Sequence, residues 1–295
     1  MPSPMDLKPV TKGIIWMSLS QLLFVVAWAS IKLVGERIPL FEITFFRSAI
    51  SVVVLVPLVG IRLGSFRGKA LKNLLLRAAF GTAAMLMSFY AMIHMDLGNS
   101  STLFNTMPIF VALLAPAMIG EPFDRRQLLL ILGGFAGIAL LLGADSGIFE
   151  TLGLMAATAG LLSAIAMIFV RKLSRTDSAL VITLFFTAFA ALVSLPFAAY
   201  EYVAPAPFEW GLILLIGLTA TIGQIFLVHA YKFGHAATIA PFAYVSVVGS
   251  YAAGIVVFGA IPDVQSVAGA LVVVACGVGI MLFAPAARQA AKERV

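Results

Sequence analysis

Ten apolar segments, arranged as two consecutive sets of five, constrain this 295-residue chain more than any other feature. The first set occupies residues 13–143 and the second residues 149–285, which leaves short tails at 1–12 and 286–295. Most segments approach the ~20 residues that a helix needs to cross the ~30 Å hydrocarbon core of a bilayer. Because five is odd, the second set enters the membrane from the opposite face. The sequence therefore predicts an all-α integral membrane protein with ten transmembrane helices in a 5+5 inverted repeat.

The composition leaves little room for a soluble domain. Hydrophobic residues make up 62% of the chain and charged residues 11%, whereas soluble domains carry about 25% charged residues. The single cysteine, Cys276, excludes an internal disulfide and a cysteine-rich metal site. The expected membrane spans are residues 13–34, 43–62, 73–93, 98–119, 127–143, 149–170, 179–199, 208–229, 236–258 and 264–285.

The basic residues orient these spans. In the ten-span scheme, 16 of the 19 Lys and Arg residues, Arg77 among them, fall on one side, and the other side has only Lys32, Arg37 and Arg47. Positive residues in short loops stay in the cytoplasm, so we expect both termini to be cytoplasmic and the chain to lie in the inner membrane. This distribution also explains the net charge of +6. No basic helix or aromatic-basic face of the kind that binds nucleic acid is present.

Local matches support a relationship between the two sets. Residues Ile43–Ala49 align with Ile182–Ala188, and Pro57 then aligns with Pro196 at the same offset. Each match is weak by itself, but their order and the shared proline of the second span indicate an internal repeat. Two similar units of opposite orientation are typical of secondary transporters, whose substrate sites lie near the midplane between the repeats.

Together these features resemble the drug/metabolite transporter superfamily in its ten-helix form, which is built from two EamA-type repeats. The resemblance covers residues 13–285 and rests on the 5+5 layout and two local features. These are Phe46-Arg47 near the start of the second span, and the run from Gly98 through Pro108 to Gly120-Glu121-Pro122 with the Gly-rich span after it. One departure is Gly259-Ala260, where the first repeat has Glu121. The resemblance implies alternating-access transport of small organic metabolites through a central cavity, and it leaves the substrate open.

Ionisable residues inside a membrane span are costly and are candidates for function. All 13 carboxylates fall in loops or at span ends, which argues against a carboxylate relay at a helix centre. Arg47 lies about five residues into its span, roughly 7 Å below the outer end. It either binds a carboxylate or phosphate, which guanidinium groups hold in bidentate fashion, or it snorkels outward or pairs with Glu36 or Glu42.

The fourth span is polar where it enters the membrane, and its polar residues share one face. Ser101, Asn105 and Pro108 are three or four residues apart. Pro108 removes a backbone donor and is expected to kink the helix. Asn105 and Ser101 are expected either to line a cavity or to hydrogen-bond to a neighbouring helix.

The ninth span is the symmetry mate of the fourth. Pro241 is its expected hinge, and Tyr244 and Tyr251, seven residues apart, share a face. Their phenols are candidates to contact a ligand, and the alternative is that Tyr244 bridges two helices.

Further cavity candidates lie in three other spans. Gln21 and Trp28 follow one stripe of the first span. Trp28 is expected to be either a cavity wall or an anchor in the outer interfacial belt, and its depth favours the cavity. Tyr90 in the third span and Gln224 in the eighth are polar groups at middle to outer depth.

Small residues mark two spans for close packing. Gly133 and Gly137 form a GxxxG pattern in the fifth span, and Gly277 and Gly279 give the tenth span a small face. Such faces allow helices to approach closely. We expect a monomer packed through them, or a homodimer if the same faces meet between copies.

The favoured interpretation is a secondary transporter of a small organic metabolite, of the amino acid, vitamin, nucleoside, carboxylate or amine class. A channel and a broad-specificity drug efflux permease are the alternatives. An intramembrane enzyme is disfavoured because no Ser–His pair or carboxylate cluster shares a depth. The three histidines lack ligand spacing, so no metal or cofactor is expected, and the partners are the substrate and the lipid bilayer.

Overall fold

In the computed structural model, the described residues are 9–63, 68–120, 126–142, 148–233 and 239–282. Every regular element within these ranges is a helix. The helices are α1 (Pro9–Val34), α2 (Leu40–Leu63), α3 (Leu71–His94), α4 (Leu97–Phe104), α5 (Met107–Ile119), α6 (Arg126–Leu142), α7 (Ile148–Leu173), α8 (Ala179–Tyr200), α9 (Pro207–Ala230), the 3-10 helix η1 (Ala240–Tyr244), α11 (Val245–Phe258) and α12 (Val264–Leu282).

Seven helical stretches in these ranges are long and apolar enough to cross a membrane. They are Thr11–Val34, Leu40–Arg62, Leu71–His94, Leu97–Ile119, Thr151–Leu173, Ala179–Tyr200 and Pro207–Ala230. Three shorter apolar helices, Leu128–Leu140, Phe242–Phe258 and Val264–Ile280, fall within the fifth, ninth and tenth expected spans. The residues 236–238 and 283–285 of the last two expected spans, and most of both tails, lie outside the described residues.

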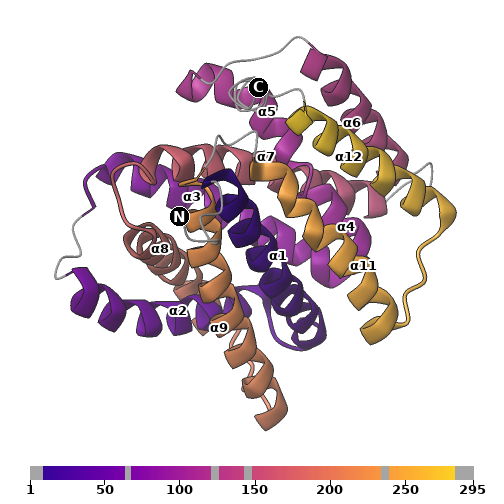
Figure 1. Ribbon diagram of the computed structural model, residues 1–295. Helices are drawn as coiled ribbons and strands as arrows, with labels where there is room; N and C mark the ends of the chain where they lie inside the picture. The colour runs from indigo at the N-terminus through magenta and orange to yellow at the C-terminus, as the bar shows by residue number, and fades with distance from the viewer. Residues whose placement is uncertain (1–8, 64–67, 121–125, 143–147, 234–238, 283–295) are drawn as a thin grey trace, which may run out of the picture.

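The most extensive helix contacts join the first half of the chain to the second. The helix α1 packs along α9, α3 along α7, α2 along α8 and α6 along α12. Figure 1 shows the α2–α8 pair on the left of the bundle and the α6–α12 pair on the right. The first helix of each half is α1 or α7, and the third is α3 or α9. In both the α1–α9 pair and the α3–α7 pair, the first helix of one half therefore packs on the third helix of the other. The halves are thus interleaved.

Small polar side chains tie these pairs together inside the bundle. The Ser20 hydroxyl on α1 donates to the Gly223 carbonyl on α9 at 2.8 Å. The hydroxyls of Ser51 on α2 and Thr221 on α9 lie 2.6 Å apart. Hydrogen bonds of this kind are a principal way in which apolar helices associate in lipid.

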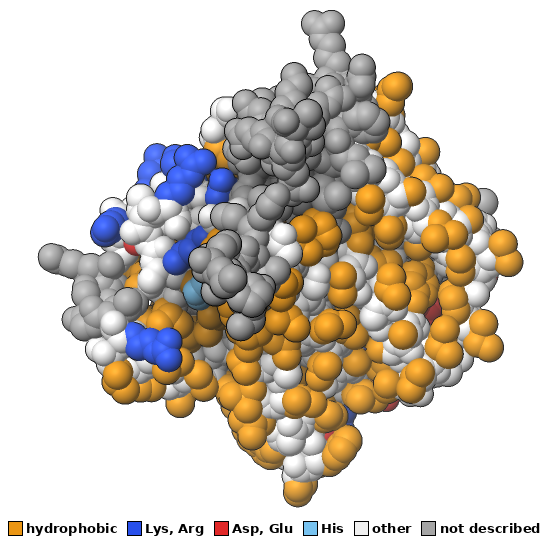
Figure 2. Space-filling model, viewed as in Figure 1, with side chains coloured by type: hydrophobic (Ala, Val, Ile, Leu, Met, Phe, Trp, Pro, Cys, Tyr) orange, Lys and Arg blue, Asp and Glu red, His pale blue; other side chains and the backbone are white. Residues whose placement is uncertain are grey.

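The outer surface of the bundle is apolar. Large hydrophobic side chains such as Val53, Ile61, Leu129 and Leu192 are exposed along the helices, and hydrophobic atoms cover most of the described face in Figure 2, with Lys and Arg gathered at the upper left. Soluble monomers rarely expose contiguous apolar surface on this scale. Together with the long apolar helices, this surface is that of a multi-pass membrane protein.

The fourth expected span is two helices rather than one kinked helix. α4 ends at Phe104 and α5 begins at Met107, with Pro108 in the first turn of α5. The interruption therefore precedes Pro108, because proline fits the first turn of a helix, where its missing N–H is not needed. In the second half, Pro241 lies in η1, and α11 follows directly.

Glycines end both of these interrupted spans. Gly120 caps α5 with φ 67°, and Gly259 caps α11 with φ 63°. Each adopts the left-handed conformation that favours glycine at a helix C-terminus. The two caps are equivalent positions of the halves, so the counterpart of Glu121 is Ala260.

The small faces of the fifth and tenth spans meet each other within the chain. A Cβ on Gly133 would lie 2.9 Å from the Cys276 sulfur, and one on Gly137 would lie 2.9 Å from Val273. A Cβ on Gly279 would lie 3.0 Å from Leu130. These glycines therefore allow close packing of α6 on α12 inside one molecule.

Candidate functional site

A cavity lies within the bundle, between the two halves. Residues from α1, α2, α3, α4, α5, α7, α8, α9 and η1 line it. Its polar lining consists of Arg47, Arg77, Gln21, Ser88, Asn105, Ser163 and Gln224, and the rest of the lining is apolar or aromatic. A mostly apolar cavity with a few convergent polar groups has the character of a small-molecule site.

One stripe of α1 forms an aromatic wall of this cavity. Gln21, Phe24 and Trp28 are three to four residues apart and therefore lie on one helical face. The rings of Phe24 and Trp28 stack with centroids 5.9 Å apart and an interplanar angle of 11°. The ring of Phe104 meets Trp28 edge-on at 5.8 Å. This wall offers a flat apolar surface to a ring or hydrocarbon chain.

Arg47 points into the cavity, and neither of its alternative roles is observed. α2 begins at Leu40, earlier than expected, so Arg47 lies about 10 Å from the start of the helix at 1.5 Å per residue. Its side chain is 2% exposed, which excludes snorkelling to the surface. Glu42 accepts a hydrogen bond from the Val203 N–H at 2.9 Å instead of pairing with Arg47.

Arg77 is a cavity residue that the sequence analysis missed. The ten-span scheme assigns it to the basic residues that orient the spans, but it lies in α3 and is 1% exposed. Its guanidinium lies 3.8 Å from the centroid of the Phe186 ring, and its Nη2 donates to Gln224 Oε1 at 3.1 Å. Gly81, one turn later on α3, leaves room for it, because a Cβ there would lie 2.7 Å from Arg77 Nη1.

The two guanidiniums approach the same ring without an acidic partner. Arg47 lies 5.7 Å from the Phe186 centroid, and its Nη1 contacts only the weakly accepting Met85 sulfur. Arg47 Nε and both Arg77 Nε and Nη1 are buried without a hydrogen-bond partner among the described residues. No carboxylate of the described ranges lines the cavity. Two buried, uncompensated positive charges make the cavity strongly attractive to anions.

Asn105 lies at the junction of α4 and α5 and both lines the cavity and joins two helices. Its Nδ2 donates to the Ser101 carbonyl at 2.8 Å and to the Ser246 hydroxyl of α11 at 3.0 Å. Ser101 donates to the Ser246 carbonyl at 3.5 Å and does not line the cavity. The interrupted helices of the two halves are therefore hydrogen-bonded to each other beside the cavity.

The three expected tyrosines lie outside the cavity lining. Tyr90 is 38% exposed, and its ring packs against His94 with centroids 4.2 Å apart. Tyr251 donates to Asn99 Oδ1 at 2.8 Å. Tyr244 is buried against Gly277 of α12, and its hydroxyl has no hydrogen-bond partner in the described part of the chain. Seven-residue spacing placed Tyr244 and Tyr251 on one face of a single helix, but that span changes from η1 to α11 at Tyr244.

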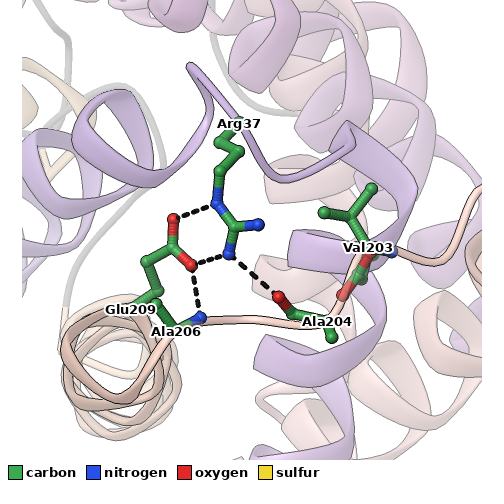
Figure 3. Close-up of polar contacts among 6 residues, drawn as sticks. Arg37, Val203, Ala204, Ala206 and Glu209 are labelled. Atoms are coloured by element: carbon green, nitrogen blue, oxygen red, sulfur yellow. Dashed lines mark hydrogen bonds and ion pairs between the residues drawn. The ribbon is translucent and has the colours of Figure 1, made fainter.

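An ion pair that we call the Arg37 clamp joins the halves at one end of the bundle. Arg37, in the loop between α1 and α2, donates through Nε to Glu209 Oε1 at 2.7 Å and through Nη2 to the Ala204 carbonyl at 2.9 Å. Figure 3 shows Glu209 also accepting the Ala206 N–H at the start of α9. The hydrogen bond to Glu209 raises the pKa of the Arg37 guanidinium above its ordinary value. Arg37 therefore remains charged at neutral pH.

A second contact between the halves, the Asp177 clamp, lies at the opposite end. Asp177, in the loop between α7 and α8, accepts the backbone N–H of Lys69 in the loop between α2 and α3, at 2.7 Å. The helix α2 separates the two clamps, and its 24 residues correspond to about 36 Å. The two clamps use equivalent loops of the two halves. The α1–α2 loop of the Arg37 clamp corresponds to the α7–α8 loop of the Asp177 clamp, and the α8–α9 connection corresponds to the α2–α3 loop.

Metal-binding side chains do not gather in the described ranges. No group of three or more His, Cys, Asp or Glu residues there is placed to hold a metal ion. The chemistry of the cavity is that of guanidinium, amide, hydroxyl and aromatic groups.

The comparisons with known proteins match both halves of the chain. The model of the EamA-like transporter family matches residues 11–143 and again residues 151–283. The pseudopaline exporter CntI of Pseudomonas aeruginosa is 30% identical over 278 residues, which cover 92% of this chain and 97% of the exporter. An S-adenosylmethionine uptake transporter of Rickettsia prowazekii is 27% identical over 274 residues, which cover 91% of this chain and 92% of that transporter.

A solved crystal structure supports the fold alone. Its sequence is 20% identical to that of this chain, and the two structures superimpose with a TM-score of 0.68. The superposition includes 90% of this chain and 97% of the solved chain. The helical arrangement described above is therefore shared over nearly the whole length of both chains.

Proposed function

The chain belongs to the EamA-like transporter family, and on this premise we propose that it carries a small organic metabolite across the inner membrane by alternating access around the central cavity. Family membership points to a transporter rather than an enzyme. The observation that carries the proposal is the cavity itself, because residues of both halves line it and it has polar groups in an otherwise apolar bundle. Relatives are named for export and for uptake, so the direction of transport is not part of the proposal.

In the proposed topology the seven long helical stretches and the three shorter apolar helices are ten membrane spans. Residues 13–143 form the first repeat and 149–285 the second, in opposite orientations, with both tails in the cytoplasm. The charge distribution supports this orientation even without Arg77, since 15 of the 19 basic residues remain on the cytoplasmic side after that correction. We propose a monomer as the transport unit, because the cavity forms within one chain and the glycines of α6 and α12 are already packed together.

The two clamps are the proposed gates. Each joins a loop of one half to a loop of the other, and they lie at opposite ends of α2. In this topology the Arg37 clamp is periplasmic and the Asp177 clamp cytoplasmic. Carriers of this architecture expose the site to one side at a time by rocking one unit against the other. If one clamp opens while the other stays closed, the cavity is exposed to one side of the membrane only.

Counterflow in proteoliposomes tests the proposal. Vesicles that contain the purified protein are loaded with unlabelled solute, and the entry of the same labelled solute is followed for a panel of amino acids, nucleosides, vitamins, amines and carboxylates. A carrier gives saturable accumulation that is stimulated by the internal solute. Flux that rises linearly with concentration, without stimulation from the opposite side, would identify a channel. Accelerated exchange of many unrelated apolar drugs would favour a broad-specificity efflux permease.

A further inference from the structure

We infer that the cavity accepts a small organic dianion, whose two acidic groups pair with Arg47 and Arg77 while its apolar body lies against the aromatic wall of α1. This inference rests on the proposed function and names the substrate class of the same cavity. The two arginines come from different helices, α2 and α3, and approach the Phe186 ring of α8. Among the described residues, they are the only charged side chains that line the cavity.

Both arginines have unused hydrogen-bonding capacity. A guanidinium has five N–H donors and is fully satisfied by carboxylate or phosphate oxygens held in its plane. Arg77 donates a hydrogen bond to Gln224 through Nη2. Its Nε and Nη1 have no hydrogen-bond partner among the described residues. Arg47 contacts the Met85 sulfur through Nη1, and no described residue accepts a hydrogen bond from its Nε. Each arginine thus has buried N–H donors that no described residue satisfies.

The two arginines also bring two buried positive charges to the cavity. Burying one unpaired cation is costly, and two cations that approach one ring also repel each other. A monoanion would leave one of these charges uncompensated, whereas a dianion compensates both. A cationic solute, or a zwitterionic solute with one acidic group, would add a positive charge to a cavity in which no described residue offers a carboxylate to receive it.

The shape of the cavity suits an apolar body. Apart from seven polar residues, the described part of the lining is apolar, and five of its side chains are aromatic: Phe24, Trp28, Phe89, Phe104 and Phe186. A ring or short hydrocarbon chain between the acidic groups fits this lining. The polar groups of Gln21 and Asn105 lie on the same lining and offer hydrogen bonds to substituents.

The test measures thermal stabilisation of the purified full chain by matched probes. The probes are succinate, glutarate, adipate and phenylsuccinate, each with its monoamide and its diamide, together with inorganic phosphate. A ligand that binds only the folded protein raises its melting temperature with concentration. We expect at least one diacid to stabilise saturably, its monoamide to bind more weakly and its diamide not to bind.

Three variants make the test specific. Arg47→Gln and Arg77→Gln should each weaken binding of that diacid by about 30-fold or more, as expected when one partner of a buried charge pair is removed. Arg62→Gln, at an exposed position of the same helix as Arg47, is the matched control and should bind normally. The monoamide should lose affinity strongly in only one of the two cavity variants, because it has one acidic group. If either variant does not fold, Arg47→Lys or Arg77→Lys keeps the charge and should bind with intermediate affinity.

Several results overturn the inference. These are stabilisation chiefly by neutral or cationic compounds, equal binding of a diacid and its diamide, equal stabilisation by phosphate, and no stabilisation by any diacid. Counterflow separates this inference from the proposed function. Saturable exchange of a neutral or cationic solute would support carrier function and contradict the dianion as substrate. Diacid binding without any exchange would support the dianion as ligand and contradict carrier function.

Discussion

The Arg77 guanidinium lies 3.8 Å from the centroid of the Phe186 ring, so a cation from the first half of the chain rests on an aromatic face from the second. This contact offsets part of the cost of burying the charge. It also fixes the position of the guanidinium between the halves, where a solute would meet it. Because Arg47 lies near the same ring, Phe186 positions both charges of the cavity.

Replacing Phe186 should therefore weaken substrate binding. The change Phe186→Leu keeps much of the apolar volume but removes the ring face, and a cation–π contact contributes about 0.5–2 kcal/mol. We expect a loss of affinity of about 2- to 30-fold, measured as the half-saturation concentration in counterflow. Phe186→Tyr keeps the ring face and is the control. Unchanged affinity in Phe186→Leu would show that the ring does not position the arginines.

Filling the space beside Arg77 should act in the same direction without unfolding the protein. In Gly81→Ala the new methyl group would lie 2.7 Å from Arg77 Nη1, the movable end of a long side chain, so the guanidinium is displaced and the fold is kept. We expect affinity to fall about tenfold, with little change in melting temperature. The matched control is Gly211→Ala, where the Cβ meets nothing within 4 Å. Equal affinity for the Gly81→Ala protein and the control would contradict the assigned position of Arg77.

The junction between α4 and α5 is packed against the backbone of α7 at Gly160. A Cβ there would lie 2.8 Å from the Phe104 carbonyl oxygen and 2.7 Å from Thr106 Oγ1, and a backbone atom cannot move aside easily. Gly160→Ala should cost about 1–3 kcal/mol through overpacking and lower the melting temperature. Gly254→Ala, which meets nothing within 4 Å, should not. A Gly160→Ala protein as stable as wild type would mean that α7 does not pack on this junction.

The Asn105–Ser246 hydrogen bond should couple the two interrupted spans. Hydrogen bonds between membrane helices contribute about 0.6–2 kcal/mol, so Asn105→Ala and Ser246→Ala should each lower stability by about 1 kcal/mol. The double variant should lose less than the sum of the two, because the residues share one contact. A thermal-unfolding double-mutant cycle measures this, and strict additivity would argue against a direct bond.

Much of the candidate site follows from helical periodicity, and the parts that do not have identifiable causes. Gln21 and Trp28 lie on one stripe of a continuous helix, so their shared position was predictable. Tyr244 was placed by the same logic on a span that is interrupted, and the change from η1 to α11 removes the register on which the prediction depended.

Arg77 was missed because a charge near a span end was treated only as a topology signal. The signal that locates it lies on the same helix, since Arg77, Gly81 and Ser88 recur at intervals of four and seven residues and form one face. Tyr90 is two residues beyond Ser88 and therefore points to a different side. Hydropathy alone does not say which face of a membrane helix turns inward, because lipid and protein interior are similarly apolar.

The most direct test of the account is the accessibility of a single cysteine in the cavity. Ser88 lines the cavity, and Cys276 is the only native cysteine, so Ser88→Cys in a Cys276→Ala background gives one reporter for a membrane-impermeant maleimide. Breaking the Arg37 clamp with Arg37→Ala should increase labelling from the periplasmic face. Breaking the Asp177 clamp with Asp177→Ala should increase labelling from the cytoplasmic face, and each change should decrease labelling from the other side. Labelling that rises from both faces together, or that neither substitution changes, would contradict alternating access around this cavity.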